Sequence, residues 1–227
     1  MNIGCHIYKD FERPDKKLIE AFSKHAVANI DDCMGRIAAV SWDIKRIGNN
    51  SGVLAGPAFT VKVPEGDNLM FHKALDLAQP GDIIMIDAGG SPERSILGEI
   101  MANYLRLRKI AGIVVDGSIR DAEEIGKMAD FFVYAKGITP NGPYKNGPGE
   151  IRGIVTVGQR VVHPGDIVVG DGDGVIVIPL SQAQQILEKV NALKAAEQAI
   201  LDTMERDLTY VRPWVDQKLA ALGCTED

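Results

Sequence analysis

The stretch Gly112-Ile-Val-Val-Asp-Gly-Ser-Ile-Arg-Asp121 decides the fold class of this chain. Its run Ile113–Val115 contains only β-branched residues, which is typical of a strand buried on both faces in an α/β protein. We expect the dipeptide Asp116-Gly117 to form the turn that ends this strand. The segment Ala122–Ile125 then carries the carboxylates favoured in the first turn of a helix. The pair Arg120-Asp121 therefore stands at the carboxyl end of a buried strand, where such folds bind ligands.

A second charged residue, Glu99, precedes Arg120 by twenty intervening residues, which is about one helix and one strand. The helix between them begins either beside Glu99 or at Ser91-Pro92, a good N-cap followed by a first-turn proline. On periodicity alone, a solvated helix carboxylate is the favoured interpretation of Glu99. The pair Arg120-Asp121 also has two equally supported interpretations. It is either a functional site, or Asp121 is a carboxylate at the start of a helix and Arg120 its ion-pair partner on the surface.

The composition is that of a soluble globular protein, with 45% hydrophobic and 25% charged residues among 227. This length predicts one domain over residues 1–227. The formal charge of -6 argues against direct binding of nucleic acid. The cysteines Cys5, Cys33 and Cys224 are scattered, which favours reduced thiols over a disulfide framework or zinc site. Because Met1–Gly4 opens no secretory signal and no apolar run is long enough for a membrane, we expect a cytoplasmic protein.

The remaining pattern alternates between helices and strands. Apolar spacing predicts two short helices between residues 15 and 37, a strand over 58–63, and a helix from 69 to 77 capped by Asp67-Asn68. Two similar segments, Pro80–Asp87 and Pro164–Asp171, each join a Pro-Gly-Asp turn to a β-branched strand. After Pro179 the chain is predicted to be helical.

Several familiar sites are excluded. The sequence Gly170-Asp-Gly-Asp-Gly174 lacks the later ligands of a calcium loop, so it predicts a tight turn between strands. No GxGxxG, GxxxxGK[ST] or GxSxG motif is present, which argues against nucleotide binding and a serine nucleophile. The four histidines have no spacing that suggests metal ligation.

The segment from Leu97-Gly98-Glu99 through Asp121 resembles a known family. This family unites the divalent-metal 4-hydroxy-4-methyl-2-oxoglutarate / 4-carboxy-4-hydroxy-2-oxoadipate aldolases with the regulator of ribonuclease activity A proteins. Further matches follow in the family's order along nearly the whole chain: Met34-Gly-Arg36, Gly66-Asp-Asn68, Gln79-Pro-Gly-Asp82, His163-Pro-Gly-Asp166 and Asp171-Gly-Asp-Gly-Val175. The resemblance implies an α/β/β/α sandwich with a C-terminal helix, assembled as a trimer or hexamer with sites between subunits.

The aldolases of this family carry an acidic residue, twenty intervening residues and then Arg-Asp, which match Glu99, Arg120 and Asp121 here. Glu99 departs from the Asp of these aldolases and reaches one methylene further. The resemblance implies that Asp121 ligates Mg²⁺ or Mn²⁺ directly. It implies that Glu99 holds the metal through water, as does Glu197 from the C-terminal helix of the neighbouring subunit.

The resemblance also implies how a 2-oxo acid is bound. The pyruvyl carboxylate meets the backbone N–H groups of Ile100 and Met101, beside Leu97 and Gly98. A metal ion that chelates a 2-oxo acid polarises its carbonyl group and stabilises the enolate formed on C–C cleavage. Arg120, a permanent bidentate donor, suits the oxygen on which negative charge develops.

The resulting hypothesis is a class II pyruvate aldolase, a carbon–carbon lyase acting on small 2-oxo acids, in which oxaloacetate decarboxylation uses the same enolate chemistry. The alternative is a non-catalytic protein regulator of an endoribonuclease. A methyltransferase is disfavoured by the lack of a glycine-rich nucleotide loop. Lys145, Arg36 and His72 are candidate contacts for a second substrate carboxylate, although a surface position explains each of them equally well.

Overall fold

The computed structural model describes residues 4–225, and its chain divides into two compact units, Met1–Val190 and Asn191–Asp227. The expectation of a single domain over residues 1–227 stays a prediction. The prediction that Met1–Gly4 opens no secretory signal concerns residues 1–3 in part, and these lie outside the described residues.

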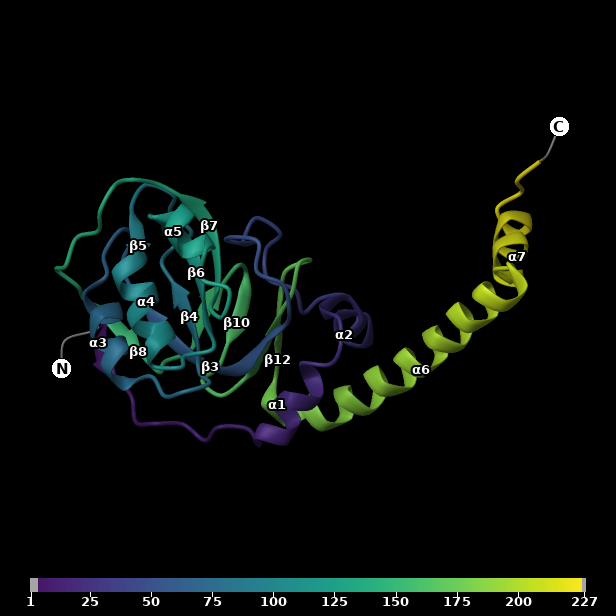
Figure 1. The fold of residues 1–227 in the computed structure, drawn as a ribbon, viewed down its shortest axis with the longest axis horizontal. Coiled ribbons are helices and arrows are strands. Elements are labelled where there is room, and N and C mark those ends of the chain that lie inside the picture. The colour runs from purple at the N-terminus through teal and green to yellow at the C-terminus, as the bar shows by residue number, and fades with distance from the viewer. Residues whose placement is uncertain (1–3, 226–227) are drawn as a thin grey trace. The chain divides into compact units, whose positions relative to one another are not determined.

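The N-terminal unit is built on a mixed sheet whose centre is parallel (Figure 1). Its strands follow the order β1-β8-β3-β4-β6-β7-β2, and neighbours from β3 to β7 run parallel. The short strand β5 pairs with the end of β6. The bounds are β1 (Cys5–Ile7), β2 (Lys45–Arg46), β3 (Leu54–Lys62), β4 (Ile83–Asp87), β5 (Ser95–Leu97), β6 (Gly112–Ile119), β7 (Phe132–Ile138) and β8 (Gly149–Ile151).

A second β layer lies against this sheet and shares β3 with it. The first part of β3, Leu54–Pro57, pairs antiparallel with β11, while Ala58–Lys62 pairs parallel with β4. β11 (Ile167–Gly170) and β12 (Val175–Ile178) form a hairpin, and β9 (Val155–Val157) forms another with β10 (Arg160–Val162). Residues 171–174 form the turn between β11, which ends at Gly170, and β12, so the Gly-Asp-Gly-Asp-Gly segment makes a tight turn between strands as predicted.

Helices cover the two outer faces, so that the unit has four layers. α3 (Leu69–Leu77), α4 (Glu99–Leu107) and α5 (Ala122–Gly126) pack on the parallel strands. α1 (Lys16–Phe22), α2 (Val27–Cys33) and the first turns of α6 (Ala183–Asp207), which follow the 3-10 helix η1 (Leu180–Gln182), pack on β11 and β12. These layers confirm the α/β/β/α sandwich with a C-terminal helix.

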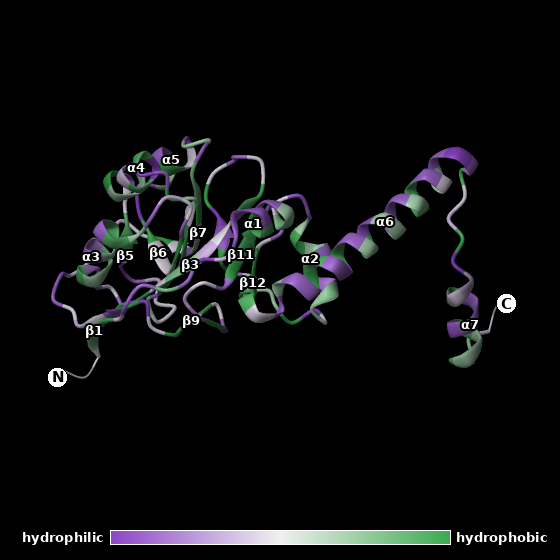
Figure 2. Cartoon of the chain, turned by 90° about the horizontal axis from the view of Figure 1, so that it is seen from below, coloured by the Kyte–Doolittle hydropathy of each residue, from purple (hydrophilic) through white to green (hydrophobic). Residues whose placement is uncertain are grey.

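The alternation of side chains along β6 shows why the middle layers are stable. Ile113 and Val115 face the helices, whereas Val114 faces the second β layer, and all three are fully buried. β4 repeats the pattern, with Ile84 packed toward the helices and Met85 toward the strands. Successive residues of a strand point to opposite faces, so an uninterrupted apolar run can fill two cores. Figure 2 shows hydrophobic residues concentrated on the strands and on the inner sides of the helices.

One local prediction is wrong. Asp116-Gly117 does not end β6; the strand continues to Ile119, and its pairing with β7 shifts register between Val115 and Ser118. The one extra residue of β6 forms a bulge, which bends the strand and redirects the side chains that follow it. Of the two helix starts that the sequence left open, the one beside Glu99 is confirmed: β5 follows Ser91-Pro92, and α4 begins at Glu99.

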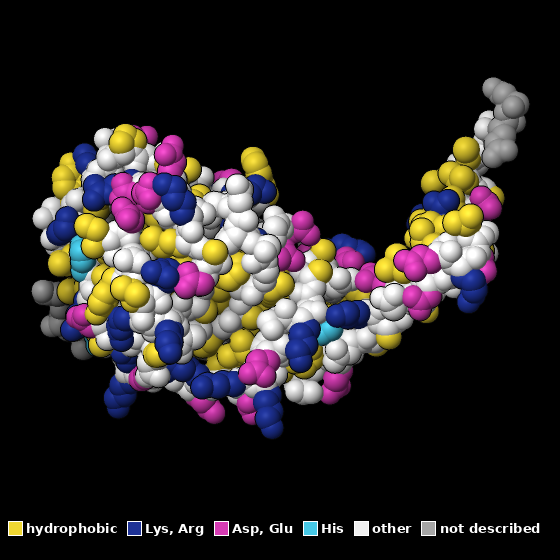
Figure 3. All heavy atoms as spheres, viewed as in Figure 1, with side chains coloured by type: hydrophobic (Ala, Val, Ile, Leu, Met, Phe, Trp, Pro, Cys, Tyr) yellow, Lys and Arg dark blue, Asp and Glu magenta, His cyan; other side chains and the backbone are white. Residues whose placement is uncertain are grey.

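The C-terminal unit consists of the rest of α6 and of α7 (Pro213–Ala221). None of its described side chains is buried, and Figure 3 shows apolar side chains on its surface. None of the helices in residues 4–225 is both long and apolar enough to cross a membrane. The large apolar side chains that this unit exposes are Ile200, Leu201, Leu208, Tyr210, Val211, Trp214, Leu219 and Leu222.

We expect Ile113→Ala to lower the free energy of unfolding by about 2–5 kcal/mol, because it opens a cavity in a fully packed core. Urea denaturation followed by circular dichroism measures the change. The control, Ile154→Ala, removes a side chain that is 61% exposed and should change stability by less than about 0.5 kcal/mol. Equal losses in the two variants would contradict the packing described above.

Candidate functional site

A pocket of about 270 Å³ lies where β5, β6 and the start of α4 meet. Six of the substrate-binding and metal-binding residues that the resemblance implies line it, namely Leu97, Gly98, Ile100, Met101, Arg120 and Asp121. The remaining lining residues come from α3 with its N-cap, from β5 and from the loop after β7: Asn68, His72, Ser95, Ile96, Gly142, Pro143 and Lys145.

Arg120 and Asp121 follow directly on β6 and lie side by side. The Arg120 Nε is 3.6 Å from Asp121 Oδ2, and both side chains are partly exposed. The same Oδ2 accepts a hydrogen bond of 3.0 Å from the backbone N–H of Glu99. Asp121 therefore holds the N-terminus of α4, although it lies 22 residues further along the chain. A carboxylate at this end of a helix is stabilised by the helix dipole.

The backbone around this pair is specialised. Asp121 has a left-handed conformation, with φ 57° and ψ 35°. Aspartate tolerates this region better than most residues, yet the conformation still stores strain that the surroundings must offset. A side chain at Gly98 would displace the charged pair, because a Cβ added there would lie 2.6 Å from Asp121 Oδ2 and 3.0 Å from Arg120 Nε. The glycine lets α4 begin against the charged pair.

The start of α4 presents backbone donors to the pocket. Ile100 and Met101 are the second and third residues of this helix, so their N–H groups have no acceptor within it. Such N–H groups, aligned with the helix dipole, suit a carboxylate or phosphate. The Ile100 side chain is 84% exposed, which leaves this end of the helix accessible.

Glu99 contributes its backbone to the site more clearly than its side chain. Its side chain is exposed and does not line the pocket. The pKa of Lys127 is raised, chiefly by a hydrogen bond to Glu124. The negative charges of Glu124, Glu123 and Glu99 add to this effect. The Glu99 carboxylate thus lies within electrostatic reach of the end of α5.

The loop after β7 closes one side of the pocket. Asp67 anchors it, because its Oδ2 accepts hydrogen bonds from the N–H groups of Asn146 (2.5 Å) and Gly147 (3.1 Å). A Cβ added to Gly142 would lie 3.3 Å from an Arg120 Nη, so the loop passes close to the guanidinium group.

Lys145 from this loop and His72 from α3 both line the pocket. Burial, and then the positive charge of Lys145, lower the pKa of His72. Both effects disfavour the imidazolium form, so His72 is neutral at pH 7. The structure thus places two of the three predicted distal contacts in the pocket with Arg120.

Besides the Glu99 side chain, one further predicted residue of the N-terminal unit does not line this pocket. Arg36 follows α2 and forms an exposed ion pair with Asp32 at 2.7 Å. Glu197 belongs to the C-terminal unit, and its predicted role in the site of a neighbouring subunit stays a prediction.

Two polar pocket residues were not predicted as site residues. The pair Asp67-Asn68 was predicted to cap α3, and Asp67 Oδ1 does accept the Leu69 N–H at 2.9 Å. Asn68, only 2% exposed, makes no cap hydrogen bond, and its side chain donates to the Ile96 carbonyl at 3.0 Å. Ser95 is fully buried and donates to the Asn141 carbonyl at 2.8 Å. A polar residue inside an otherwise apolar strand was the only available signal for Ser95.

We expect Lys145→Met to raise the pKa of His72 toward its ordinary value of 6.5, because it removes a neighbouring positive charge. NMR titration of the imidazole measures this shift. The control, Lys73→Met, removes the adjacent lysine of α3, which forms an ion pair with Asp76, and should leave the His72 pKa unchanged. A lower or unaltered pKa in Lys145→Met would show that Lys145 does not act on His72.

Sequence comparisons identify relatives of this chain. The model of the RraA-like family, described as Aldolase/RraA, matches residues 27–177. A Halalkalibacterium halodurans protein named "Putative 4-hydroxy-4-methyl-2-oxoglutarate aldolase" is 35% identical over 190 residues, which cover 84% of this chain and 90% of that protein. Such names support an aldolase within this family.

Solved structures share the fold. Streptomyces coelicolor RraAS2, described as an unusual member of the RNase ES inhibitor RraA protein family, is 27% identical with a TM-score of 0.72, covering 85% of this chain and 100% of that one. The RNA-processing inhibitor RraA from Thermus thermophilis is 28% identical with a TM-score of 0.62, covering 68% and 92%. The family match spans more than half of the sequence, and the chain therefore belongs to the RraA-like family.

Proposed function

We propose that this protein is a divalent-metal-dependent pyruvate aldolase that cleaves 4-hydroxy-4-methyl-2-oxoglutarate or 4-carboxy-4-hydroxy-2-oxoadipate type substrates. The observation that carries the proposal is the Arg120–Asp121 pair beside the N-terminus of α4. It combines a carboxylate for a cation, a fixed positive charge and free N–H donors in one pocket.

The donor set suits a hard cation that keeps several waters. Asp121 offers carboxylate oxygen, and within residues 4–225 no three His, Cys, Asp or Glu side chains gather closely enough to hold a metal. Mg²⁺ and Mn²⁺ are typically held by one or two carboxylates plus water and substrate. Asp121 would be the direct ligand. Glu99 of the same chain and the partner subunit's Glu197 would hold the ion through water. Such an ion supplies a Lewis acid for the 2-oxo group.

The chain's own groups then bind and orient the substrate. The N–H groups of Ile100 and Met101 receive the carboxylate next to the 2-oxo group. Arg120 donates to the oxygen that becomes negative when the C3–C4 bond breaks and its electron pair moves to the pyruvate enolate. Because the guanidinium is already held beside Asp121, this stabilisation needs little reorganisation.

A proton must leave the C4 hydroxyl and another must reach the enolate carbon. We assign Glu99 or Glu197 to orient the water that takes the first proton and returns the second. Decarboxylation of oxaloacetate yields the same enolate, so we propose it as a side activity. The products of the main reaction are pyruvate and the carbonyl compound formed from C4.

The C-terminal unit supports an assembly in which subunits complete each other's sites. It buries none of its described side chains, and a short isolated helix such as α7 is marginal in water. We propose that this unit packs on another subunit of a homotrimer or homohexamer.

We expect Asp121→Asn to lower pyruvate release at least about a hundredfold, because it removes the charge that attracts the cation. Asparagine tolerates the left-handed conformation and can still accept the Glu99 N–H, so the fold should persist. A lactate-dehydrogenase-coupled assay measures pyruvate. EDTA should abolish the activity and Mg²⁺ or Mn²⁺ should restore it.

The control for this variant is Asp130→Asn, which removes a surface carboxylate paired with Arg106 outside the pocket and should retain activity. Pyruvate release that survives complete chelation, or that persists in Asp121→Asn, would rule out the proposed metal-dependent reaction.

The far side of the pocket favours substrates with a second carboxylate. Lys145 supplies a positive charge there, and neutral His72 supplies a hydrogen-bonding group. We propose that both contact the distal carboxylate of the substrate. Arg36 has no part in this subsite of the same chain, because it lies outside the pocket.

We expect Lys145→Met to raise the KM for a dicarboxylic or tricarboxylic 4-hydroxy-2-oxo acid about tenfold, since a hydrogen-bonded charge contact is lost. Exchange of the pyruvate methyl protons with deuterium, followed by NMR, should keep its wild-type rate because pyruvate lacks the distal group. A parallel loss in both assays would assign Lys145 to the reacting end instead.

The alternative function is a protein regulator of an endoribonuclease. It is favoured by the resemblance to the Streptomyces and Thermus structures, whose names describe inhibitors of ribonuclease or RNA processing. A pull-down with a purified RNase E-type enzyme separates the two functions. Binding without metal-dependent pyruvate release would support the regulator, and release without binding would support the enzyme.

A further inference from the structure

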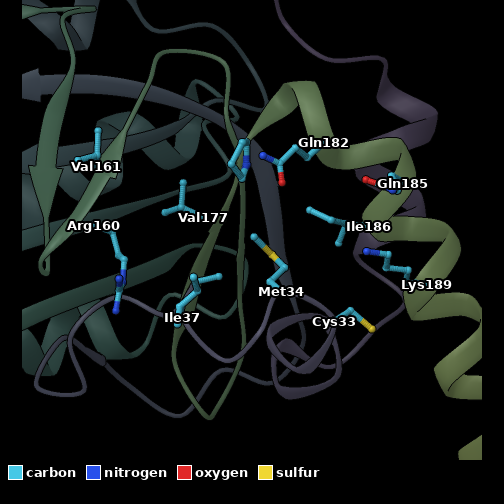
Figure 4. Close-up of a pocket in the computed structure, with 12 residues that line it drawn as sticks. Cys33, Met34, Ile37, Arg160, Val161, Val177, Gln182, Gln185, Ile186 and Lys189 are labelled. Atoms are coloured by element: carbon cyan, nitrogen blue, oxygen red, sulfur yellow. The ribbon is translucent and has the colours of Figure 1, made fainter.

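A second pocket, of about 420 Å³, lies in the N-terminal unit between α2, the β-strands of the second layer and the start of α6 (Figure 4). It shares no residue with the pocket that contains Arg120 and Asp121. Its lining residues are Cys33, Met34, Ile37, Ala38, Arg160, Val161, Val177, Pro179, Gln182, Gln185, Ile186 and Lys189.

The charge of this pocket is opposite to that of the protein. None of its lining residues is acidic, although the chain has 31 Asp and Glu residues and a net charge of -6. Two cations, Arg160 and Lys189, lie on its rim. An anion is therefore attracted to this part of a surface that repels anions on average.

Both cations retain donor capacity. The Nε of Arg160 donates to the Ala39 carbonyl at 2.6 Å, which orients the guanidinium group and leaves its Nη atoms available. In the part of the chain that the structure describes, no carboxylate lies within 4 Å of either Arg160 or Lys189. The carboxamides of Gln182 and Gln185 add neutral hydrogen-bonding groups to the same rim.

The floor between these polar groups is apolar. Figure 4 shows Met34, Ile37 and Ile186 between Arg160 on one side and Lys189 on the other. Ile37 is 68% exposed, so the apolar surface is accessible. The unbranched thioether of Met34 adapts to the shape of a ligand and contacts aromatic rings favourably.

We propose that this pocket binds an aromatic monocarboxylate, with the ring on Met34, Ile37 and Ile186 and the carboxylate held by Arg160 or Lys189. A volume of about 420 Å³ is within the range of small-molecule sites and holds a ring system of ten or more heavy atoms. The occupant differs from the polar 2-oxo acids proposed for the catalytic pocket, so the inference is independent of that function.

The test is isothermal titration calorimetry of the full-length protein with 1-naphthoate, which carries both a fused ring system and a carboxylate. Two probes separate these parts: 1-naphthalenemethanol keeps the rings without the charge, and acetate keeps the charge without the rings. We expect saturable binding of one 1-naphthoate per chain, about tenfold or more tighter than that of either partial probe.

Variants locate the binding. Arg160→Gln and Lys189→Gln should together weaken 1-naphthoate binding at least about tenfold, because the charged donors of the rim are lost. Ile37→Glu should abolish 1-naphthoate binding. Because Ile37 is exposed, we expect this variant to fold as the wild type does. The matched control, Lys17→Gln, removes an exposed lysine outside the pocket and should bind as the wild type does.

Arg120→Met supplies the control for the catalytic pocket and should retain full 1-naphthoate binding. The proposal is overturned by an absence of saturable binding, by equal binding of the alcohol, or by wild-type affinity in Arg160→Gln/Lys189→Gln. Loss of binding in Arg120→Met overturns it as well, because the ligand would then occupy the catalytic pocket. None of these outcomes bears on pyruvate release, which the coupled assay tests separately.

Discussion

The hydrogen bond from the Glu99 N–H to Asp121 Oδ2 is the contact on which the candidate site depends. It joins the start of α4 to the end of β6, two segments separated by a helix and a strand. The left-handed backbone of Asp121 and the missing side chain at Gly98 both serve this contact, since any Cβ at position 98 would collide with the carboxylate. One carboxylate thereby caps a helix and stays partly exposed in the pocket, beside a guanidinium group.

That contact is held in place by the layers behind it. β6 is buried along its whole length, with alternate residues packed into two different cores. Strand β3 pairs with both β4 and β11, and so ties the two β layers together. Movement of the strand end that carries Arg120 would disturb tightly packed side chains on both faces, which is costly in a close-packed interior. The backbone of β6 that leads to Arg120 and Asp121 is therefore supported by packing on both faces.

Sequence patterns located the elements well where apolar periodicity was long. The helices around residues 15–37 and 69–77 and the two strands after Pro-Gly-Asp turns were found at their observed places. The two Pro-Gly-Asp strands nevertheless have different neighbours, because β4 lies between parallel strands while β11 pairs antiparallel. The local sequence favours a strand because of its β-branched side chains. The partner and direction of that strand depend instead on which distant segment forms hydrogen bonds with each of its edges.

The sequence by itself determined the fold class, the family resemblance and six of the thirteen residues that line the candidate pocket, because these depend on residue type and spacing. Tertiary structure decided the bulge at Asp116-Gly117, the start of α4 at Glu99, and the recruitment of Asn68 and Ser95. It also separated Arg36 from the pocket while bringing His72 and Lys145 into it. These outcomes depend on contacts between residues far apart in the chain, and the free energy of such contacts is not contained in any local pattern.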